Sequence, residues 1–177
     1  LRKATFRGLA QNSGNTNGVA AVKPASLPLL TKARQIRELS PVEAGWEYPV
    51  KMRGVVTLAY QRNLYVQDDT AGIYVRSRLP GVLKPGDLIE IEGASNPGRY
   101  APIVVPTNII HLGTAPAPVS PEVSLFQMAS GQYDSQWIEA YAVVRDEHLV
   151  DGLLQLKLSD RDGTFLAKIP TSSAPTN

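Results

Sequence analysis

Cysteine is absent from this chain of 177 residues, and histidine occurs only twice. The missing thiols exclude disulfides, cysteine-based zinc sites and a cysteine nucleophile. His111 and His148 have no serine and aspartate pattern beside them of the kind that forms a catalytic triad. We interpret His111 as an isolated histidine at the end of a strand and His148 as one in a loop. The sequence therefore predicts no catalytic residues, no metal site and no cofactor.

Long hydrophobic runs are also missing. No stretch approaches eighteen uninterrupted apolar residues, which excludes a membrane-spanning helix within these residues. Apolar residues make up 43% and charged residues 19%, the balance of a globular protein. With 14 glycines and 14 prolines, the chain is expected to form many short elements joined by turns.

Acidic residues are missing from residues 1–37, which carry seven lysines and arginines. The remainder holds eleven basic against 16 acidic residues and is mildly acidic. Residues 1–29 are polar and broken by glycine and proline, which predicts a flexible basic arm or linker. Its charges are scattered and do not form contiguous blocks. This favours a solvated linker over a tail that binds nucleic acid or a membrane surface.

Hydrophobic residues alternate with polar ones from residue 46 onward, which is typical of β-strands. Two short helices precede them, one over residues 33–39 and one opened by the capping box Ser40-Pro41-Val42-Glu43. The strands are expected at residues 50–59, 64–67, 72–76 and 88–93, with a broken fifth strand at 102–105 and 108–112. Because such a sheet must curl to remove its edges, residues 30–115 are predicted to form an OB-fold-like five-stranded barrel.

Residues 116–177 repeat the same pattern in part. A second capping box begins at Ser124. Trp137–Val144 resembles Val50–Val55, the beginning of the first strand, which lies about 88 residues earlier. Further strands are expected at 154–158 and 164–169, joined by the turn Asp160-Arg161-Asp162-Gly163. The fold class is therefore mainly β, with a second, incomplete OB-like copy truncated after three strands. We expect the chain to be a fragment, the alternative being a half-barrel that packs against the first copy.

The candidate binding face lies on the second and third strands of the first barrel. Because Leu64, Val66, Ile73 and Val75 should point inward, the alternate side chains point outward. OB-folds bind oligonucleotides and oligosaccharides on this face, between the loops after strands one and four. The predicted ligand-binding residues are Tyr60, Arg62, Tyr65, Tyr74, Arg76, Arg99 and Tyr100. The alternative is that these tyrosines have only a structural role, because tyrosine is common on exposed strands and forms cross-strand pairs.

The charges around this face bear on the ligand. Acidic residues are frequent on the predicted barrel, which lacks the basic excess of a nucleic-acid binder. They are Asp68, Asp69, Asp87, Glu90 and Glu92. A small polar molecule, a glycan or a neighbouring protein domain fits this surface at least as well, and nucleic acid is the alternative partner.

Several segments together carry a family resemblance. They are residues 30–44, 48–57, 64–75, 85–93 and 134–139, and they include Gln35-Ile36-Arg37-Glu38-Leu39-Ser40-Pro41, Leu64-Tyr65-Val66-Gln67-Asp68 and Asp134-Ser135-Gln136-Trp137. Residues 30–169 resemble the tandem OB-like modules in the extracytoplasmic sensor region of bacterial two-component sensor histidine kinases. The resemblance implies a non-enzymatic sensory module, periplasmic or extracellular, in a membrane-anchored signalling receptor. It supplies no ligand, and the alternative is a cytoplasmic nucleic-acid-binding OB-fold protein.

Overall fold

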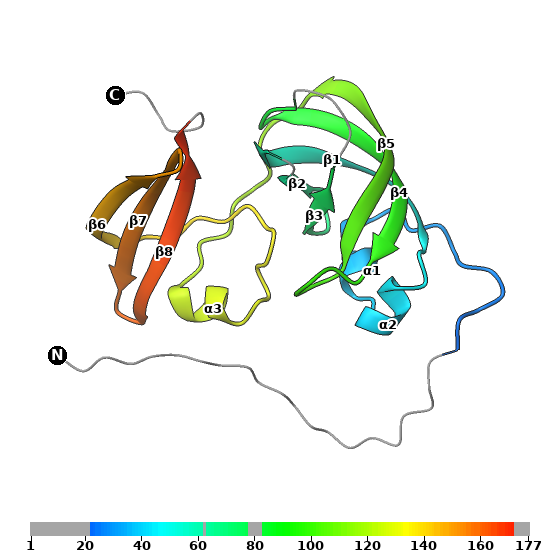
Figure 1. Cartoon of the computed structure of the whole chain (residues 1–177), viewed down its shortest axis with the longest axis horizontal. Coiled ribbons are helices and arrows are strands. Elements are labelled where there is room, and N and C mark those ends of the chain that lie inside the picture. The colour runs from blue at the N-terminus through cyan, green and yellow to red at the C-terminus, as the bar shows by residue number, and fades with distance from the viewer. Residues whose placement is uncertain (1–21, 62, 78–82, 172–177) are drawn as a thin grey trace, which may run out of the picture.

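The computed structural model describes residues 22–61, 63–77 and 83–171, and Figure 1 shows a barrel and a separate small sheet. Most of the predicted arm, residues 1–21, lies outside the described residues. The helices are α1 (Ala33–Arg37), α2 (Pro41–Ala44) and α3 (Leu125–Ala129). The strands of the barrel are β1 (Pro49–Tyr60), β2 (Asn63–Gln67), β3 (Gly72–Arg76), β4 (Asp87–Asn96) and β5 (Ile103–Thr114). The small sheet contains β6 (Val143–Val150), β7 (Leu153–Asp160) and β8 (Gly163–Pro170).

The first five strands form a closed barrel in the order β1-β2-β3-β5-β4. β1 is antiparallel to β2 and to β4, and the barrel is closed where β3 runs parallel to β5 at Val75 and Val104. This is the five-stranded Greek-key arrangement of an OB-fold, which confirms the predicted fold class. Gly54 lets β1 coil tightly across β2, because a Cβ at this position would lie 2.6 Å from a methyl group of Val66.

The barrel interior is the hydrophobic core. The inward residues predicted from alternation are each at most 4% exposed, namely Leu64, Val66, Ile73, Val75, Ile89 and Ile91. Met52, Val56 and Val104 belong to the same cluster. Burying one such side chain stabilises the fold by about 1.5–3 kcal/mol, so the alternation decides the register of the whole barrel.

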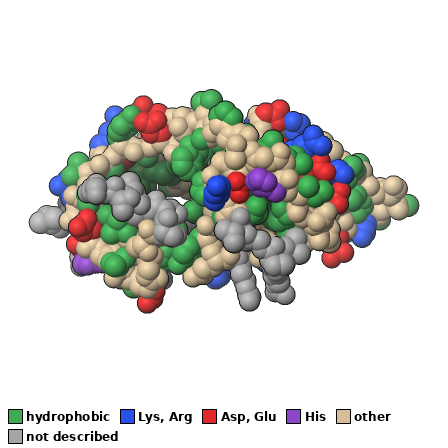
Figure 2. Space-filling view, turned by 90° about the horizontal axis from the view of Figure 1, so that it is seen from above, with side chains coloured by type: hydrophobic (Ala, Val, Ile, Leu, Met, Phe, Trp, Pro, Cys, Tyr) green, Lys and Arg blue, Asp and Glu red, His purple; other side chains and the backbone are tan. Residues whose placement is uncertain are grey.

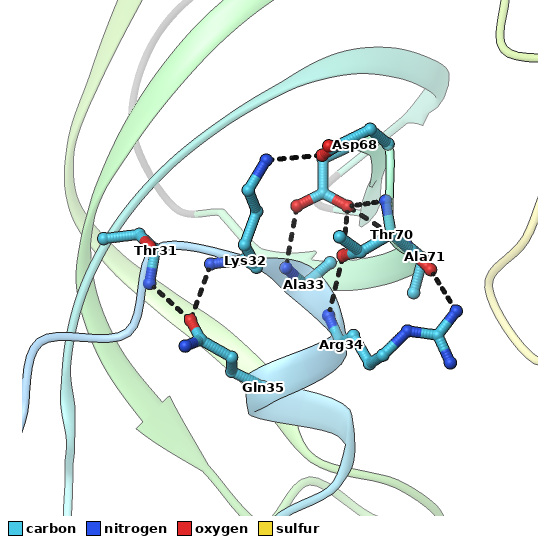
Figure 3. A network of polar contacts seen from close by, with 9 residues as sticks. Thr31, Lys32, Ala33, Arg34, Gln35, Asp68, Thr70 and Ala71 are labelled. Atoms are coloured by element: carbon cyan, nitrogen blue, oxygen red, sulfur yellow. Dashed lines mark hydrogen bonds and ion pairs between the residues drawn. The ribbon is translucent and has the colours of Figure 1, made fainter.

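Helix α1 closes one end of the barrel and is held there by Asp68, in the turn between β2 and β3 (Figure 3). Ala33 and Ile36 of α1 are fully buried. The Asp68 carboxylate accepts hydrogen bonds from the backbone N–H groups of Ala33 (2.8 Å) and Thr70 (2.7 Å). Arg34 adds a bond from its backbone N–H to the Thr70 hydroxyl (3.1 Å). One acidic turn residue thus fixes both the turn and the entry of the helix.

Helix α2 follows directly and is capped as its sequence predicts. The Ser40 hydroxyl accepts from the Glu43 backbone N–H, and the Glu43 carboxylate accepts from the Ser40 N–H. At its other end, the buried Ser95 hydroxyl donates to the Ala44 carbonyl (2.9 Å). None of the helices in the described part of the chain is long and apolar enough to cross a membrane.

The small sheet has the order β6-β7-β8 with antiparallel neighbours. It lies beside α3, apart from the barrel (Figure 1). The turn at Asp160–Gly163 joins β7 to β8 as predicted.

Three expectations about strand boundaries were wrong. The strand expected over Trp137–Val144 begins only at Val143, and before it Glu139 forms an isolated bridge to Glu122. His148 lies within β6 and not in a loop, because the β6–β7 hairpin continues to Val150 and Leu153. The fifth strand is continuous. Its apparent break is an irregularity in the pairing of β4 with β5, between Glu92 and Gly93.

Candidate binding face on strands β2 and β3

Two tyrosines form the centre of the outer face of β2 and β3. Tyr65 and Tyr74 are directly opposed across the two strands, with ring centroids 5.4 Å apart and a tilt of 55°. The Tyr74 hydroxyl donates to the Asn63 side chain at 2.8 Å. Such an aromatic pair contributes about 0.5–1.5 kcal/mol beyond its buried area. Both rings are half-buried, so they present a fixed aromatic surface that keeps part of its area open to solvent.

At one end of this face, three strands bring Tyr60, Asn63 and Arg76 into one row. Tyr60 is the Cα partner of Asn63 on β2, and Asn63 is the partner of Arg76 on β3. Arg76 is exposed, and the Tyr60 hydroxyl accepts from the Gln61 side chain at 3.2 Å. Arg62, also predicted here, lies outside the described residues. This end of the face combines an aromatic ring with a cation.

Arg99 and Tyr100 lie in the loop between β4 and β5, and they contact each other. The Arg99 guanidinium lies 5.2 Å from the centre of the Tyr100 ring, and Tyr100 is 88% exposed. Among the described residues, no hydrogen bond or ring contact joins this pair to Tyr65 or Tyr74. The structure therefore brings Tyr60, Tyr65, Tyr74 and Arg76 together and leaves Arg99 and Tyr100 as a separate exposed pair.

The other end of the face is covered by the chain's own residues 134–137. The Trp137 backbone N–H donates to the side-chain oxygen of Gln67 at 2.7 Å. Gln67 points outward as predicted, yet it is only 9% exposed because this segment lies over it. A Cβ on Gly72 would overlap the carbonyl oxygen of Ser135. The face thus holds a piece of polypeptide backbone against β2 and β3.

Arg37 of α1 fixes the same segment from the side. Its guanidinium donates to the Asp134 carbonyl at 2.7 Å and lies 3.5 Å from the Asp134 carboxylate. It also donates to the Gly72 carbonyl at 3.4 Å. The side chain of Arg37 is only 16% exposed, so this contact is partly shielded from solvent. Arg37 and Gly72 are therefore functional candidates that sequence reasoning missed.

A signal for these two residues exists in the sequence, but it is weak. The sequence places Gly72 at the start of the third strand, and a glycine in a strand also marks a place where another backbone approaches closely. Arg37 was counted only as one of the basic residues near the N-terminus. Neither residue indicates its partner, because residues 134–137 lie more than 60 positions further along the chain.

The electrostatics of the face follow from this cover. Burial raises the pKa of the Tyr65 phenol above its ordinary value of 10.0, and the nearby Tyr74 and Asp134 add to the rise. The Asp134 carboxylate therefore lies near the aromatic pair, and it is paired with the Arg37 guanidinium.

The histidines and acids do not form an alternative centre. His111 lies 3.3 Å from the buried Asp87, and His148 lies 3.0 Å from Asp146. Within residues 22–61, 63–77 and 83–171, no group of three or more histidine, aspartate and glutamate side chains is placed to hold a metal ion.

Neither a protein-family model nor a curated protein matches the sequence. Solved structures that are similar in part include the following three. The hypothetical protein ygiW from E. coli shares 19% identity over 47% of this chain and 89% of its own, with a TM-score of 0.39. The S. pombe telomere capping protein Ten1 shares 18% identity over 49% of this chain and 81% of its own, with a TM-score of 0.37. The S. pombe Stn1–Ten1 complex matches 36% of this chain and 57% of its own at 15% identity and a TM-score of 0.30. These likenesses are too distant to assign a function.

Proposed function

We propose that this protein is a non-enzymatic OB-fold binding module that recognises polypeptide on the outer face of β2 and β3. One observation carries the proposal: that face holds residues 134–137 of the same chain through main-chain contacts. Gln67 accepts from a backbone N–H, Arg37 donates to a backbone carbonyl, and Gly72 provides the space for a backbone. Contacts of this kind suit a peptide, whose backbone offers an N–H donor and a carbonyl acceptor at almost every residue.

The charge distribution supports the same choice. Outside residues 1–37 the chain is mildly acidic, and Asp134 lies beside the aromatic pair. On the face drawn in Figure 2, acidic and basic side chains of the described residues are interspersed and form no wide basic patch. Nucleic-acid binding depends on neutralising phosphates with clustered lysine and arginine.

The family resemblance suggests where such a module would act. As part of an extracytoplasmic sensor region, it would be periplasmic or extracellular and would bind a neighbouring domain of a membrane-anchored receptor. Its partner would compete with residues 134–137 for the same face, because both need Gln67 and the space above Gly72. Partner binding would then release residues 134–137 from β2 and β3. This release is a structural change that a sensory module could pass to the rest of the receptor.

A competition experiment tests the proposal. Residues 132–138 are replaced by glycine and serine, and a fluorescent peptide of residues 131–140 is added. We expect the peptide to bind this variant and to bind the wild type much more weakly, because a tethered segment has an effective concentration on the order of millimolar. Gly72→Ala in the same variant should abolish binding, since its Cβ overlaps the docked backbone. Equal binding with and without Gly72→Ala would contradict the proposal.

The second candidate is single-stranded nucleic acid, favoured by the pairing of Tyr65 and Tyr74 near Arg76. Aromatic stacking contributes about 1–3 kcal/mol per base and would be lost in Tyr65→Ala. We expect residues 30–177 to bind a labelled oligonucleotide only weakly at physiological salt, with no change in Tyr65→Ala or Tyr74→Ala. If residues 30–177 bound the oligonucleotide with submicromolar affinity, and either substitution abolished that binding, the ligand would be nucleic acid and not polypeptide.

A further inference from the structure

The small sheet repeats the first half of the barrel contact by contact. In the barrel, Asp68 accepts from the N–H of Ala33, the first residue of α1. In the small sheet, Asp160 accepts at 3.3 Å from the N–H of Leu125, the first residue of α3. The two residues are 35 positions apart in both cases. The unit α3-β6-β7-β8 therefore corresponds to α1-β1-β2-β3.

The first strands of the two units share an irregularity that aligns them. The pairing of β1 with β2 shifts between Val56 and Leu58, and that of β6 with β7 shifts between Val144 and Asp146. With Val144 placed on Val56, β6 begins at the counterpart of Val55, where β1 changes its partner from β4 to β2. Residues 137–142 thus match the part of β1 that pairs with β4.

This match explains why the strand expected from Trp137 is absent. Residues 137–142 have a strand-like pattern, but a strand also needs a neighbour for its backbone N–H and C=O groups. Apart from the bridge at Glu139, the described residues supply no ladder for this segment. Among the described residues, the edge formed by residues 137–142 is therefore open, and β8, which pairs only with β7, is the other open edge of the small sheet.

The face of the small sheet that corresponds to the barrel interior is apolar and incompletely covered. Leu156, Leu158, Phe165 and Ala167 occupy the places of Leu64, Val66, Ile73 and Val75. The barrel residues are at most 4% exposed, whereas their counterparts are only half-buried. The contrast is largest on the first strand, where Val144 is 52% exposed and Val56 is 1% exposed.

In the first unit, a β-hairpin covers this face. β4 pairs with the first half of β1, β5 pairs with β3, and Ile89, Ile91 and Val104 of the hairpin are fully buried. In the small sheet, α3 reaches only one end of the face, where a Cβ on Gly163 would lie 3.3 Å from the Leu125 side chain. An open strand edge beside an exposed apolar face is the surface that β-strand addition uses.

We propose that β6, β7 and β8, with residues 137–142, form an acceptor site for an amphipathic β-hairpin of a partner polypeptide. The first strand of that hairpin runs antiparallel to residues 137–143, and its second strand runs parallel to β8 beside Ala167. Both strands carry isoleucine or valine at alternate positions toward Leu156 and Leu158, with polar residues on the other side. This acceptor site shares only Trp137 with the segment held on the outer face of β2 and β3, and it does not depend on the function proposed there.

A second copy of the chain is a poor source of this hairpin. Its β4 and β5 already close its own barrel, and donating them would expose Ile89, Ile91 and Val104 to water. Two small sheets could still pack face to face through Leu156 and Leu158. That arrangement would give a dimer, which sedimentation distinguishes from acceptance of a hairpin.

The site can be tested by supplying a hairpin of known sequence. Residues 85–115 are duplicated directly after Asn177, which gives nearly the spacing found between β3 and β4. In the matched control, the added hairpin alone carries Ile89→Asp and Ile91→Asp, so residues 1–177 are identical in both proteins. Amide hydrogen exchange is measured for residues 138–142 and for β8.

We expect at least tenfold slower exchange at residues 138–142 with the native added hairpin, and no change with the control hairpin. Leu158→Ser in the acceptor should remove this protection, whereas Lys157→Ser on the opposite face of β7 should leave it intact. Equal exchange in the two fusions would overturn the proposal. So would an unfused chain that is dimeric and already protected at residues 138–142, because the face would then belong to a second copy.

Discussion

Replacing Asp68 by alanine should destabilise the barrel more than its place in a turn would indicate. The Asp68 carboxylate accepts four hydrogen bonds, from the N–H groups of Ala33, Thr70 and Ala71 and from the Thr70 hydroxyl. Ala33 and Ala71 are buried, so their N–H groups cannot simply turn to water. An unsatisfied buried donor costs about 1–3 kcal/mol, and the loss of a helix cap costs about 1 kcal/mol.

Because neighbouring bonds of one carboxylate are not additive, we expect Asp68→Ala to lower the free energy of unfolding by about 3 kcal/mol. For a unit of this size, that corresponds to a fall in Tm of roughly 12–24 °C. The assay is thermal unfolding followed by tryptophan fluorescence in a Trp137→Phe background. Trp46 is then the only tryptophan, and it packs against the barrel core.

The adjacent Asp69 provides the matched control. It forms an ion pair with Lys32, but its side chain is 71% exposed, so Asp69→Ala should leave the Tm unchanged within error. Asp160→Ala removes the corresponding cap in the small sheet and should leave the Trp46 transition where it is. A wild-type Tm for Asp68→Ala, or an equal loss in Asp69→Ala, would refute the role assigned to the Asp68 network.

Three further predictions concern the barrel and its face. Gly54→Ala should lower the urea midpoint by the equivalent of about 1–3 kcal/mol, because its Cβ crowds β2. The hydrogen bond from the Lys84 N–H lowers the pKa of Asp87 below 3.8, and His111 lowers it further. The ionised Asp87 carboxylate therefore stabilises the fold above pH 3.8, and this stabilisation is lost as the pH falls below that value. Asp87→Asn should therefore flatten the acid loss of stability measured by urea unfolding from pH 5 to pH 2. The pKa of Tyr65, followed by ultraviolet titration, should fall toward 10.0 when residues 132–138 are replaced by glycine and serine.

The barrel could be predicted from sequence because each strand carries its own evidence. Ile89 and Ile91 are separated by one polar residue, and only one register buries them both. The Pro85-Gly86 turn likewise depends on local conformation, with Gly86 at φ 93°. These signals are local, so they remain valid whatever the rest of the chain does.

The candidate site could be predicted only in part, since its remaining features depend on distant segments. Alternation correctly placed Tyr65 and Gln67 on the outside, but it could not show that Trp137 covers Gln67. The strand expected from Trp137 failed for a related reason, because strand formation depends on a pairing partner as well as on pattern. Burial of an outward residue and absence of a patterned strand are both long-range effects.

The two units differ at positions that bear on the binding surfaces proposed for them. Aligned through Asp68 and Asp160, Gly72 corresponds to Thr164, whose side chain would obstruct a backbone docked on that face. The small sheet therefore lacks the space for a backbone that Gly72 gives the barrel. The described residues cover its apolar inner face only in part. The complete unit presents its outer face to a partner and the incomplete one presents its inner face. Both surfaces are suited to main-chain contacts, and for this reason we expect the partner of each to be polypeptide.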